Sequence, residues 1–509
     1  MAVEVSKRFQ YQDSRLLQSR ILTCSRSIRK ERAMRITSDV ARIGFMTFGD
    51  HRPDMWKNVF SRLAIPLHQK AMAELKKLPV ELVCAEEVAR TRDQINDAVD
   101  YLKSQNVDVL VAHVPCWTSP NLVVHGVQRM GIFTVILGNR DPGSHGCVGL
   151  LGASGALSQI GFPHRCIREN YDGEIYQRKV LPLLNAAAVR EKLKGSVFGL
   201  FGGRSIGIDT STYDPMQWKT QFGVDSEHLD QVEIIRVAET IPQDRIDKHR
   251  DWLEAGVSEV VYNDAKLTKE KFDFQIACYL ATKDLVKEYG MDFVALKCMH
   301  ELSNSYVPQC ITQALLANYD DAEGEKETTP IACEADADGA LTQQILKLLS
   351  GGKPTFFADV SHIDNDRKKM YCVNCGALCV YYANRSNDTR ENLKKIVIKQ
   401  SVRPGGGGIT YFNAAPGPMQ LARLYRKNGK YKMAIIPCQA EDPTKEMLEE
   451  FIEARGPHQL PALFAKVDFD LDAFINEYGS NHISGVEGNY LNELLEVCSI
   501  LDIEAEVFA

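Results

Sequence analysis

No apolar run in this sequence of 509 residues approaches the length of a membrane-spanning helix. Basic residues are not in excess either, because 60 Lys and Arg stand against 67 Asp and Glu, a formal net charge of −7. A nucleic-acid-binding protein needs a basic face, so this balance disfavours that class. The hydrophobic content of 44% and the charged content of 25% are typical of globular proteins. We therefore expect neither a membrane nor a nucleic acid as a partner.

The 14 cysteines show no disulfide framework. Many lie inside apolar runs, as Cys278 and Cys438 do, which is typical of reduced thiols in the cytosol and predicts a cytoplasmic protein. Cys372, Cys375 and Cys379 form one cluster. A structural zinc site needs a fourth ligand and usually a second ligand pair, and none is evident nearby, so zinc is not favoured there.

A dinucleotide-binding fingerprint is also missing. The Gly-rich turn Gly202–Gly207 follows a predicted strand, but its glycines do not have the G-x-G-x-x-G spacing. This disfavours a nicotinamide-dependent dehydrogenase.

Residues 1–37 are rich in Arg and poor in acids. Such a composition fits a transit peptide. The helical spacing of Leu16, Leu17 and Ile21 equally fits an arm that packs on a neighbouring chain. We favour the arm, because transit peptides are usually richer in Ser.

Strand and helix patterns alternate over most of the chain. This predicts two doubly wound α/β domains with parallel sheets, at 38–190 and 191–360. The expected strands are 42–48, 80–84, 107–114, 132–137, 196–201, 231–237 and 293–297, and a helix that ends near Leu78 is interrupted at Pro66. The acidic run 320–327 is expected to be a solvated loop, because its like charges repel one another.

The alternation ends after residue 360. Short strand-like runs occur at 396–398, 409–412 and 433–436, and Asn428-Gly429 is a strong hairpin signal. Residues 361–509 are therefore predicted to form a mainly antiparallel, barrel-like β domain.

Two acids end apolar runs on either side of one amphipathic helix. The run 331–333 ends on Glu334, the helix stops at Gly351-Gly352, and the run 355–358 ends on Asp359. Strand, helix and strand predict a βαβ unit with parallel strands, and both acids would then lie at the carboxyl edge where ligands bind.

Paired carboxylates suit two tasks: holding a hard divalent cation, or acting as acid and base on a substrate. A Gly-punctuated polar loop, 476–482, adds His482 near the C-terminus. Glu334, Asp359 and His482 together form a set suited to Mn²⁺ or another divalent cation.

The stretches CEADADGALTQQIL, FFADV and NEYGSNH resemble the L-fucose isomerase family and, more distantly, the L-arabinose isomerases. The resemblance runs from about Ile43 to the end of the sequence. It implies that Glu334, Asp359 and His482 bind Mn²⁺ and that the protein is an aldose–ketose isomerase. The chemistry of that reaction, a proton moved between C2 and C1 through an enediol, needs a carboxylate base, and Glu334 and Asp359 are the candidate catalytic acids, either of which could be the base. The resemblance also implies a homo-oligomer, expected to be a hexamer.

By their places after the first and a later strand, Arg52 and Trp117 match residues of that family that touch the sugar. Asn481, next to His482, is a third candidate for substrate binding. The resemblance is less specific for the sugar, and a differently substituted hexose such as a 6-deoxy-6-sulfo sugar is an alternative substrate. Two α/β domains that clamp a sugar without chemistry are a second alternative, although binding alone needs no metal.

Overall fold

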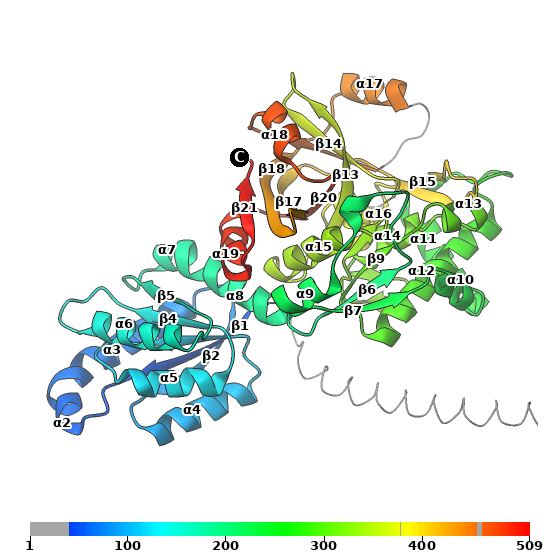
Figure 1. The fold of residues 1–509 in the computed structure, drawn as a ribbon. Helices are drawn as coiled ribbons and strands as arrows, with labels where there is room; N and C mark the ends of the chain where they lie inside the picture. The colour runs from blue at the N-terminus through cyan, green and yellow to red at the C-terminus, as the bar shows by residue number, and fades with distance from the viewer. Residues whose placement is uncertain (1–39, 377, 456–460) are drawn as a thin grey trace, which may run out of the picture.

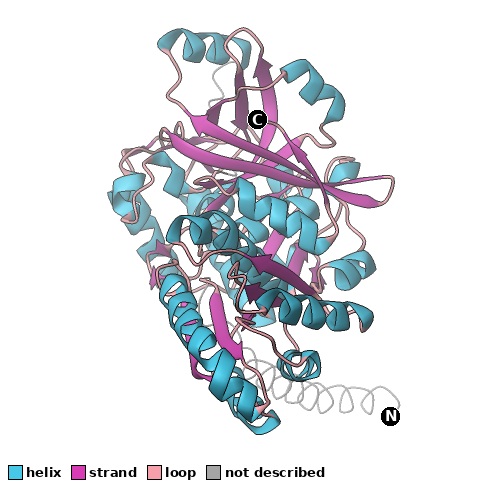
Figure 2. Cartoon of the chain, turned by 90° about the vertical axis from the view of Figure 1, so that its left-hand side faces the viewer, coloured by secondary structure: helices cyan, strands magenta, loops and turns pink. Residues whose placement is uncertain are grey.

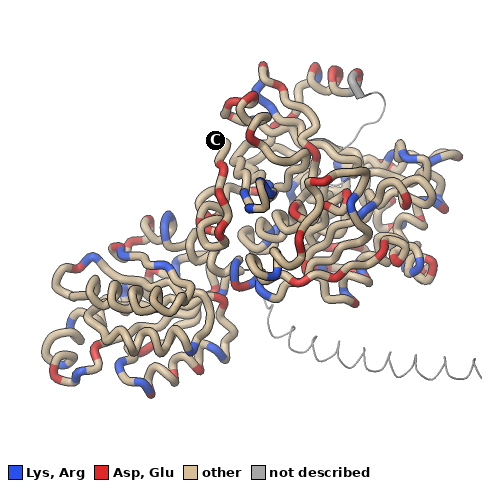
Figure 3. Tube along the Cα trace, in the orientation of Figure 1, with Lys and Arg blue, Asp and Glu red and all other residues tan. Residues whose placement is uncertain are grey.

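The computed structural model describes residues 40–376, 378–455 and 461–509. The predicted arm at 1–37 lies outside this range. Figure 1 shows two lobes: the first α/β domain forms the smaller one, and the second sheet and the barrel form the larger one. Lys and Arg are interspersed with Asp and Glu over both lobes (Figure 3).

The first lobe is a five-stranded parallel sheet in the order β2-β1-β3-β4-β5. Its strands are β1 (Arg42–Phe48), β2 (Glu81–Ala89), β3 (Val109–His113), β4 (Thr134–Gly138) and β5 (His164–Arg168). One face packs on α3 (Ser61–Leu75) and α8 (Leu181–Leu193), and the other on α4 (Arg92–Ser104), α5 (Pro120–Met130) and α6 (Gly146–Gln159). The four strands predicted here are present. Pro66 lies inside α3 without ending it.

The second sheet is also parallel and has the order β12-β9-β6-β7. Its strands are β6 (Val197–Phe201), β7 (Asp225–Leu229), β9 (Phe293–Leu296) and β12 (Ile331–Cys333). The surrounding helices are α9 (Pro215–Gln221), α10 (Val232–Ala238), α11 (Gln243–Gly256), α12 (Lys269–Tyr289), α14 (Cys310–Leu316) and α15 (Ala337–Leu349). The prediction of a strand at 231–237 was wrong, because this segment forms α10. Its apolar run is short, and burial of Ile234, Ile235 and Ala238 follows helical spacing.

The C-terminal region is a closed antiparallel barrel of six strands in the order β17-β20-β13-β14-β19-β18, closed by the pairing of β17 with β18. The strands are β13 (Thr355–Asp364), β14 (Lys369–Val373), β17 (Gly417–Lys427), β18 (Lys430–Ala440), β19 (Ala462–Lys466) and β20 (His482–Glu487), and β21 (Glu504–Val507) joins β18 in parallel. Long strands lie in the upper half of the view in Figure 2. The predicted hairpin at Asn428-Gly429 is present between β17 and β18. Two parallel sheets followed by an antiparallel barrel confirm the predicted fold class.

The expected parallel pairing around Glu334 and Asp359 was wrong. β12 pairs with β9 in the second sheet, whereas β13 pairs antiparallel with β14 and β20 in the barrel. The apolar run of β13 is buried from Thr355 to Ala358, so it fits a barrel wall under α15 as well as a parallel sheet. The domain boundary at residue 360 stays a prediction, and β13 itself belongs to the barrel sheet.

The remaining elements are shorter helices, single turns and short strands. The smaller helices are α2 (Pro53–Met55), α7 (Gly173–Ile175), α13 (Glu301–Ser305), α16 (Thr389–Leu393), α17 (Lys445–Arg455), α18 (Leu471–Glu477) and α19 (Leu491–Leu501), with single turns η1 (Trp56–Phe60), η2 (Tyr176–Val180), η3 (Asp209–Ser211) and η4 (Val380–Ala383). The smaller strands are β8 (Glu259–Val260), β10 (Asp320–Asp321), β11 (Gly324–Glu325), β15 (Val397–Gln400) and β16 (Gly408–Tyr411). α19 packs on α8, so the chain's last helix ties the barrel to the first lobe. Within the described residues, no helix is both long and apolar enough to cross a membrane.

Candidate metal centre

Glu334 stands at the turn between β12 and α15. Both Glu334 and Ala335 have positive φ, at 59° and 55°, so the chain turns sharply at the carboxyl end of β12. Asp336 then caps α15 by accepting a hydrogen bond from the Gly339 amide at 2.8 Å. This turn holds the Glu334 side chain over the edge of the second sheet.

Asp359 and His482 reach the same place from the barrel. They are direct partners in the antiparallel ladder between β13 and β20, so their side chains lie on one face of the barrel wall. The loop before His482 is fixed locally, since the Val360 amide donates to the Asn481 carbonyl and the Tyr478 hydroxyl donates to the His482 carbonyl.

The three side chains converge at the junction of the second sheet and the barrel. His482 Nε2 lies 2.8 Å from Glu334 Oε2 and 3.3 Å from Asp359 Oδ1, and one ligand atom from each residue lies within 4.8 Å of the others. The His482 side chain is fully buried and that of Glu334 is 8% exposed, whereas that of Asp359 is 36% exposed. The cluster is therefore closed on the His482 side and open beside Asp359, and a catalytic metal site would need such an open side.

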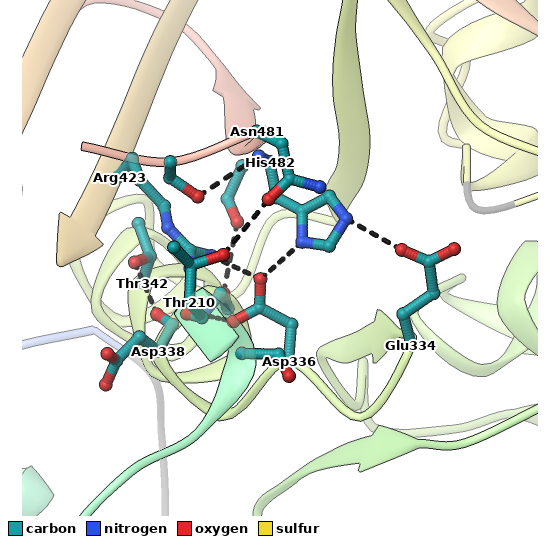
Figure 4. Close-up of polar contacts among 12 residues, drawn as sticks. Thr210, Glu334, Asp336, Asp338, Thr342, Arg423, Asn481 and His482 are labelled. Atoms are coloured by element: carbon teal, nitrogen blue, oxygen red, sulfur yellow. Dashed lines mark hydrogen bonds and ion pairs between the residues drawn. The ribbon is translucent and has the colours of Figure 1, made fainter. Parts of the chain in front are cut away.

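Two buried charged side chains, Asp336 and Arg423, hold His482 in position (Figure 4). The Asp336 carboxylate lies 2.6 Å from His482 Nδ1 and accepts a hydrogen bond from Arg423 at 2.7 Å, and all three side chains are fully buried. Arg423 also donates to the Thr210 carbonyl at 3.0 Å. Sequence reasoning missed Asp336 and Arg423. The only signal was a second acid two residues after Glu334, which reads equally well as a helix cap.

These contacts set the charges of the cluster. Burial alone would lower the pKa of His482, but hydrogen bonds to Asp336, Asp359 and Glu334 raise it well above its usual value. Burial also opposes ionisation of Asp336, yet Arg423 and His482 lower the pKa of that carboxyl to about 2. Two carboxylates and an imidazole whose Nδ1 is tied to Asp336, with Nε2 facing the acids, fit a divalent cation of the Mn²⁺ type.

Arg52 and Trp117 lie in the other lobe. Arg52 follows β1, is bound by the fully buried carboxylate of Asp50 at 2.6 Å, and has a side chain that is 46% exposed. Trp117 follows the neighbouring strand β3 and packs in a small cluster with Trp56 and Phe60. Among the described residues, no hydrogen bond, ion pair or ring contact joins Arg52 or Trp117 to Glu334, Asp359 or His482. Arg52 and Trp117 thus lie at the same edge of the first sheet, and neither contacts the candidate metal centre of the same chain.

Asn481 is exposed next to His482, and its side-chain oxygen accepts a hydrogen bond from Thr210 at 3.0 Å. Beside the open side of the cluster, Asn374 donates to Asp359 Oδ2 at 3.0 Å. Asn374 was not predicted, because nothing in its sequence surroundings distinguishes it from a loop residue.

A second group of ligand-type side chains occurs at His249, Asp321 and Glu323. Its carboxylates are already paired, because Lys283 binds both acids, at 2.5 and 2.7 Å, and Arg245 binds Glu323 at 2.5 Å. This group therefore offers a cation no free carboxylate. The prediction that the acidic run is fully solvated was wrong for Asp321, which is buried.

The predicted cysteine cluster is divided by the fold. Cys372 lies in the barrel core, and Cys379 contacts Asn318. Cys375 lies instead against the thiols of Cys310 and Cys333, whose hydrogen bonds lower its pKa well below the usual value, with burial opposing and Arg403 reinforcing this.

Comparison with known proteins agrees with this architecture. The first N-terminal domain of L-fucose isomerase matches residues 40–195, and the C-terminal domain of L-fucose isomerase matches residues 372–508. The matched family models thus indicate a sugar isomerase. The chain belongs to the L-fucose isomerase family.

Among curated proteins, a sulfoquinovose isomerase of Priestia megaterium (strain ATCC 12872 / QMB1551) is 20% identical over 450 residues, covering 86% of this chain and 94% of that protein. A sulfoquinovose isomerase of Clostridium sp. (strain MSTE9) is 22% identical over 454 residues, with the same coverage. A solved periplasmic solute-binding protein of Actinobacillus succinogenes 130z with bound D-allose is 13% identical, covers 61% of this chain and 92% of its own, and has a TM-score of 0.16. A likeness this low bears on neither fold nor ligand.

Proposed function

We propose that this protein is a metal-dependent aldose–ketose isomerase that acts on an open-chain sugar through an enediol intermediate. The observation that carries the proposal is the convergence of Glu334, Asp359 and His482 from two different sheets, with ligand atoms within 4.8 Å of one another and one open side. Mn²⁺ or another divalent cation bound there would polarise the sugar carbonyl.

The chain's own groups supply the proton transfer. Aldose and ketose differ by one proton moved between C2 and C1 and one moved between the two oxygens. Glu334 and Asp359 are the acids placed to take the proton from one carbon and return it to the next. His482 holds its place through Asp336 and leaves Nε2 directed at the acids.

For the substrate, a 6-deoxy-6-sulfo sugar is the candidate that the curated relatives favour, since those relatives are named sulfoquinovose isomerases. A neutral hexose or deoxyhexose is the second candidate, favoured by the family models. The free thiols of the described cysteines support a reducing, cytoplasmic location.

The proposal is tested by incubating the Mn²⁺-loaded protein in D₂O with sulfoquinovose, L-fucose, D-arabinose and D-glucose, followed by NMR. We expect ketose from at least one aldose, with deuterium at the carbon that receives the proton. Glu334→Gln and Asp359→Asn should each lower the rate by orders of magnitude while bound Mn²⁺ is measured separately. Rapid turnover in both variants with metal bound would refute the carboxylate shuttle, and the absence of any ketose would refute the isomerase.

A further inference from the structure

A cavity of about 400 Å³ lies where the first lobe meets the last helix of the chain. Its walls are the edge strand β5, the turn η2 with the start of α8, and one face of α19. α19 packs on α8 at this junction of the two lobes (Figure 1). The volume is in the range of small-molecule sites. No residue of the candidate metal centre lines the cavity, nor do Arg52 and Trp117, so the proposed reaction does not account for it.

The lining of this cavity is basic, in a chain whose formal net charge is −7. Four cations stand against two acids, and the cations are Arg165, Arg168, Arg178 and Lys179. The acids are Glu169 and Glu496. Arg165 and Arg168 come from β5, whereas Arg178 and Lys179 come from η2. Positive side chains from two walls therefore line one concave space, where charges of one sign reinforce each other's field.

Two of the four cations have partners within the protein. Lys179 binds the Glu169 carboxylate, which Arg140 also binds at 2.8 Å. The Arg165 guanidinium donates to the carbonyl and the hydroxyl of Ser499, both at 3.1 Å, in the last turn of α19. These contacts join β5 to η2 and to α19, and so fix the shape of the cavity.

The other two cations, Arg168 and Arg178, are exposed where they line the cavity. Within the described residues, neither guanidinium has an ion pair or a hydrogen bond, although Glu169 and Glu496 line the same space. Water can solvate a lone arginine anywhere on a surface. Two unpaired guanidinium groups on different walls of one cavity instead repel each other, and an anion between them would remove that repulsion.

Arginine is suited to binding phosphate because its planar group donates two parallel hydrogen bonds. Two arginines match the charge of a phosphate dianion better than that of a singly charged sulfonate or carboxylate. The side chains of Ile167, Leu495 and Asn492 also line the cavity, which leaves room for a small organic part. We propose that this cavity binds a phosphate monoester of the size of a sugar phosphate, with Arg168 and Arg178 holding the phosphate group. Because the walls belong to both lobes, the bound ligand would also hold the lobes together.

The test titrates D-glucitol 6-phosphate, inorganic phosphate and D-glucitol into the Mn²⁺-loaded protein by calorimetry. We expect D-glucitol 6-phosphate to bind more tightly than inorganic phosphate and far more tightly than D-glucitol. Arg168→Gln and Arg178→Gln should each weaken the binding of D-glucitol 6-phosphate by about 10- to 100-fold, the size expected for lost charged hydrogen bonds, and Arg168→Lys should recover part of it. His482→Ala, which removes a proposed metal ligand, should leave this binding unchanged. The site does not depend on the proposed reaction, so ketose formation has no bearing on the outcome.

Arg390→Gln, an exposed arginine on α16, is the matched control and should bind as the wild type does. D-Glucitol 6-phosphate should also raise the thermal unfolding midpoint of the wild type but not that of the Arg168→Gln/Arg178→Gln double variant. Equal unfolding midpoints of the ligand-free proteins exclude misfolding. Absence of binding in the wild type would overturn the site, as would equal binding by the double variant. Inorganic phosphate bound as tightly as the monoester would contradict an organic ligand, and loss of binding in His482→Ala would place the phosphate at the metal centre instead.

Discussion

At the scale of residues, the proposed metal ligand His482 is supported by a buried pair, Asp336 and Arg423, that sequence patterns do not single out. Asp336 is bound at one oxygen by the helix amide of Gly339 and at the other by Arg423, and it fixes the ring of His482. Outer partners of this kind commonly change metal affinity by about 10- to 100-fold when mutated.

We therefore expect Asp336→Asn to weaken Mn²⁺ binding by about 10- to 100-fold, because Asn still caps the helix but loses the charge that holds the ring. The measurement is the Mn²⁺ dissociation constant of metal-stripped protein, by calorimetry or by EPR of free Mn²⁺. Asp388→Asn, at the cap of α16, is the control and should leave the constant unchanged. An unaltered affinity in Asp336→Asn would contradict the positioning role.

Asp338 gives the fold a pH dependence of its own. Burial raises its pKa to about 7 from an ordinary value of 3.8, with Asp336 adding to this and Arg423, Arg426 and Tyr431 opposing it. Between about pH 4 and pH 7 the native state then binds more protons than the unfolded state, so this group reduces the free energy of unfolding as pH rises and has no further effect above about pH 7.

Asp338→Asn should remove that slope, since the amide cannot ionise and still accepts a hydrogen bond from Tyr431. Unfolding midpoints of the two proteins from pH 4.5 to pH 8 provide the check. The unfolding midpoint of the variant should rise relative to that of the wild type as pH increases. Parallel curves for the two proteins would show that Asp338 ionises in the folded protein as it does in the unfolded chain.

The candidate site residues that could be predicted from the sequence are those with a local signal. Glu334 and Asp359 stand where runs stop, and His482 stands in a polar loop, so each was visible locally. Asp336, Asn374 and Arg423 act through contacts between segments 15 or more residues apart, and local pattern carries no such information.

At the scale of elements, the strand that carries Asp359 shows where prediction fails. The boundaries of β1, β9, β12 and α15 follow from apolar periodicity and from glycine or proline stops. Which sheet β13 joins depends instead on partners later in the chain, β14 and β20. Glu334 and Asp359 still lie close together. His482 on β20 is the ladder partner of Asp359 and contacts both acids, and α15 connects the second sheet to the barrel.

The hairpin between β17 and β18 is predictable and testable. Asn428 and Gly429 both have positive φ, at 54° and 77°, and a Cβ at Gly429 would meet no atom within 4 Å. Gly429→Ala should therefore cost about 1 kcal/mol through backbone strain alone. Denaturant unfolding, followed with a probe in the barrel, measures this change in the free energy of unfolding, with Lys427→Ala as the exposed control. A stabilised Gly429→Ala variant would contradict the turn.

At the scale of the whole molecule, Arg52 and Trp117 lie in the first lobe, away from the candidate metal centre of the same chain. The family resemblance explains this by an oligomer, proposed to be a hexamer, in which one subunit's first lobe reaches the neighbour's centre. The change from parallel sheets to an antiparallel barrel was readable from the change of periodicity, whereas assembly was not, because it depends on surfaces rather than on local pattern.

Co-expression of Arg52→Ala with His482→Ala chains tests this assembly. Each variant alone should be nearly inactive, and the mixture should regain about a quarter of wild-type activity, because random pairing completes one site in four. Light scattering reports the oligomeric state. A fully active monomer, or a mixture as inactive as its parents, would contradict shared sites.

Glu334, Asp359 and His482 are proposed to hold the metal on which isomerisation depends. The most direct measurement titrates Mn²⁺ into verified metal-free protein while bound metal and ketose formation are recorded together. We expect no turnover without metal, activity rising in proportion to one Mn²⁺ bound per chain, and neither binding nor activity in His482→Ala. Full activity in the metal-free protein, or one tightly bound activating ion in His482→Ala, would contradict it.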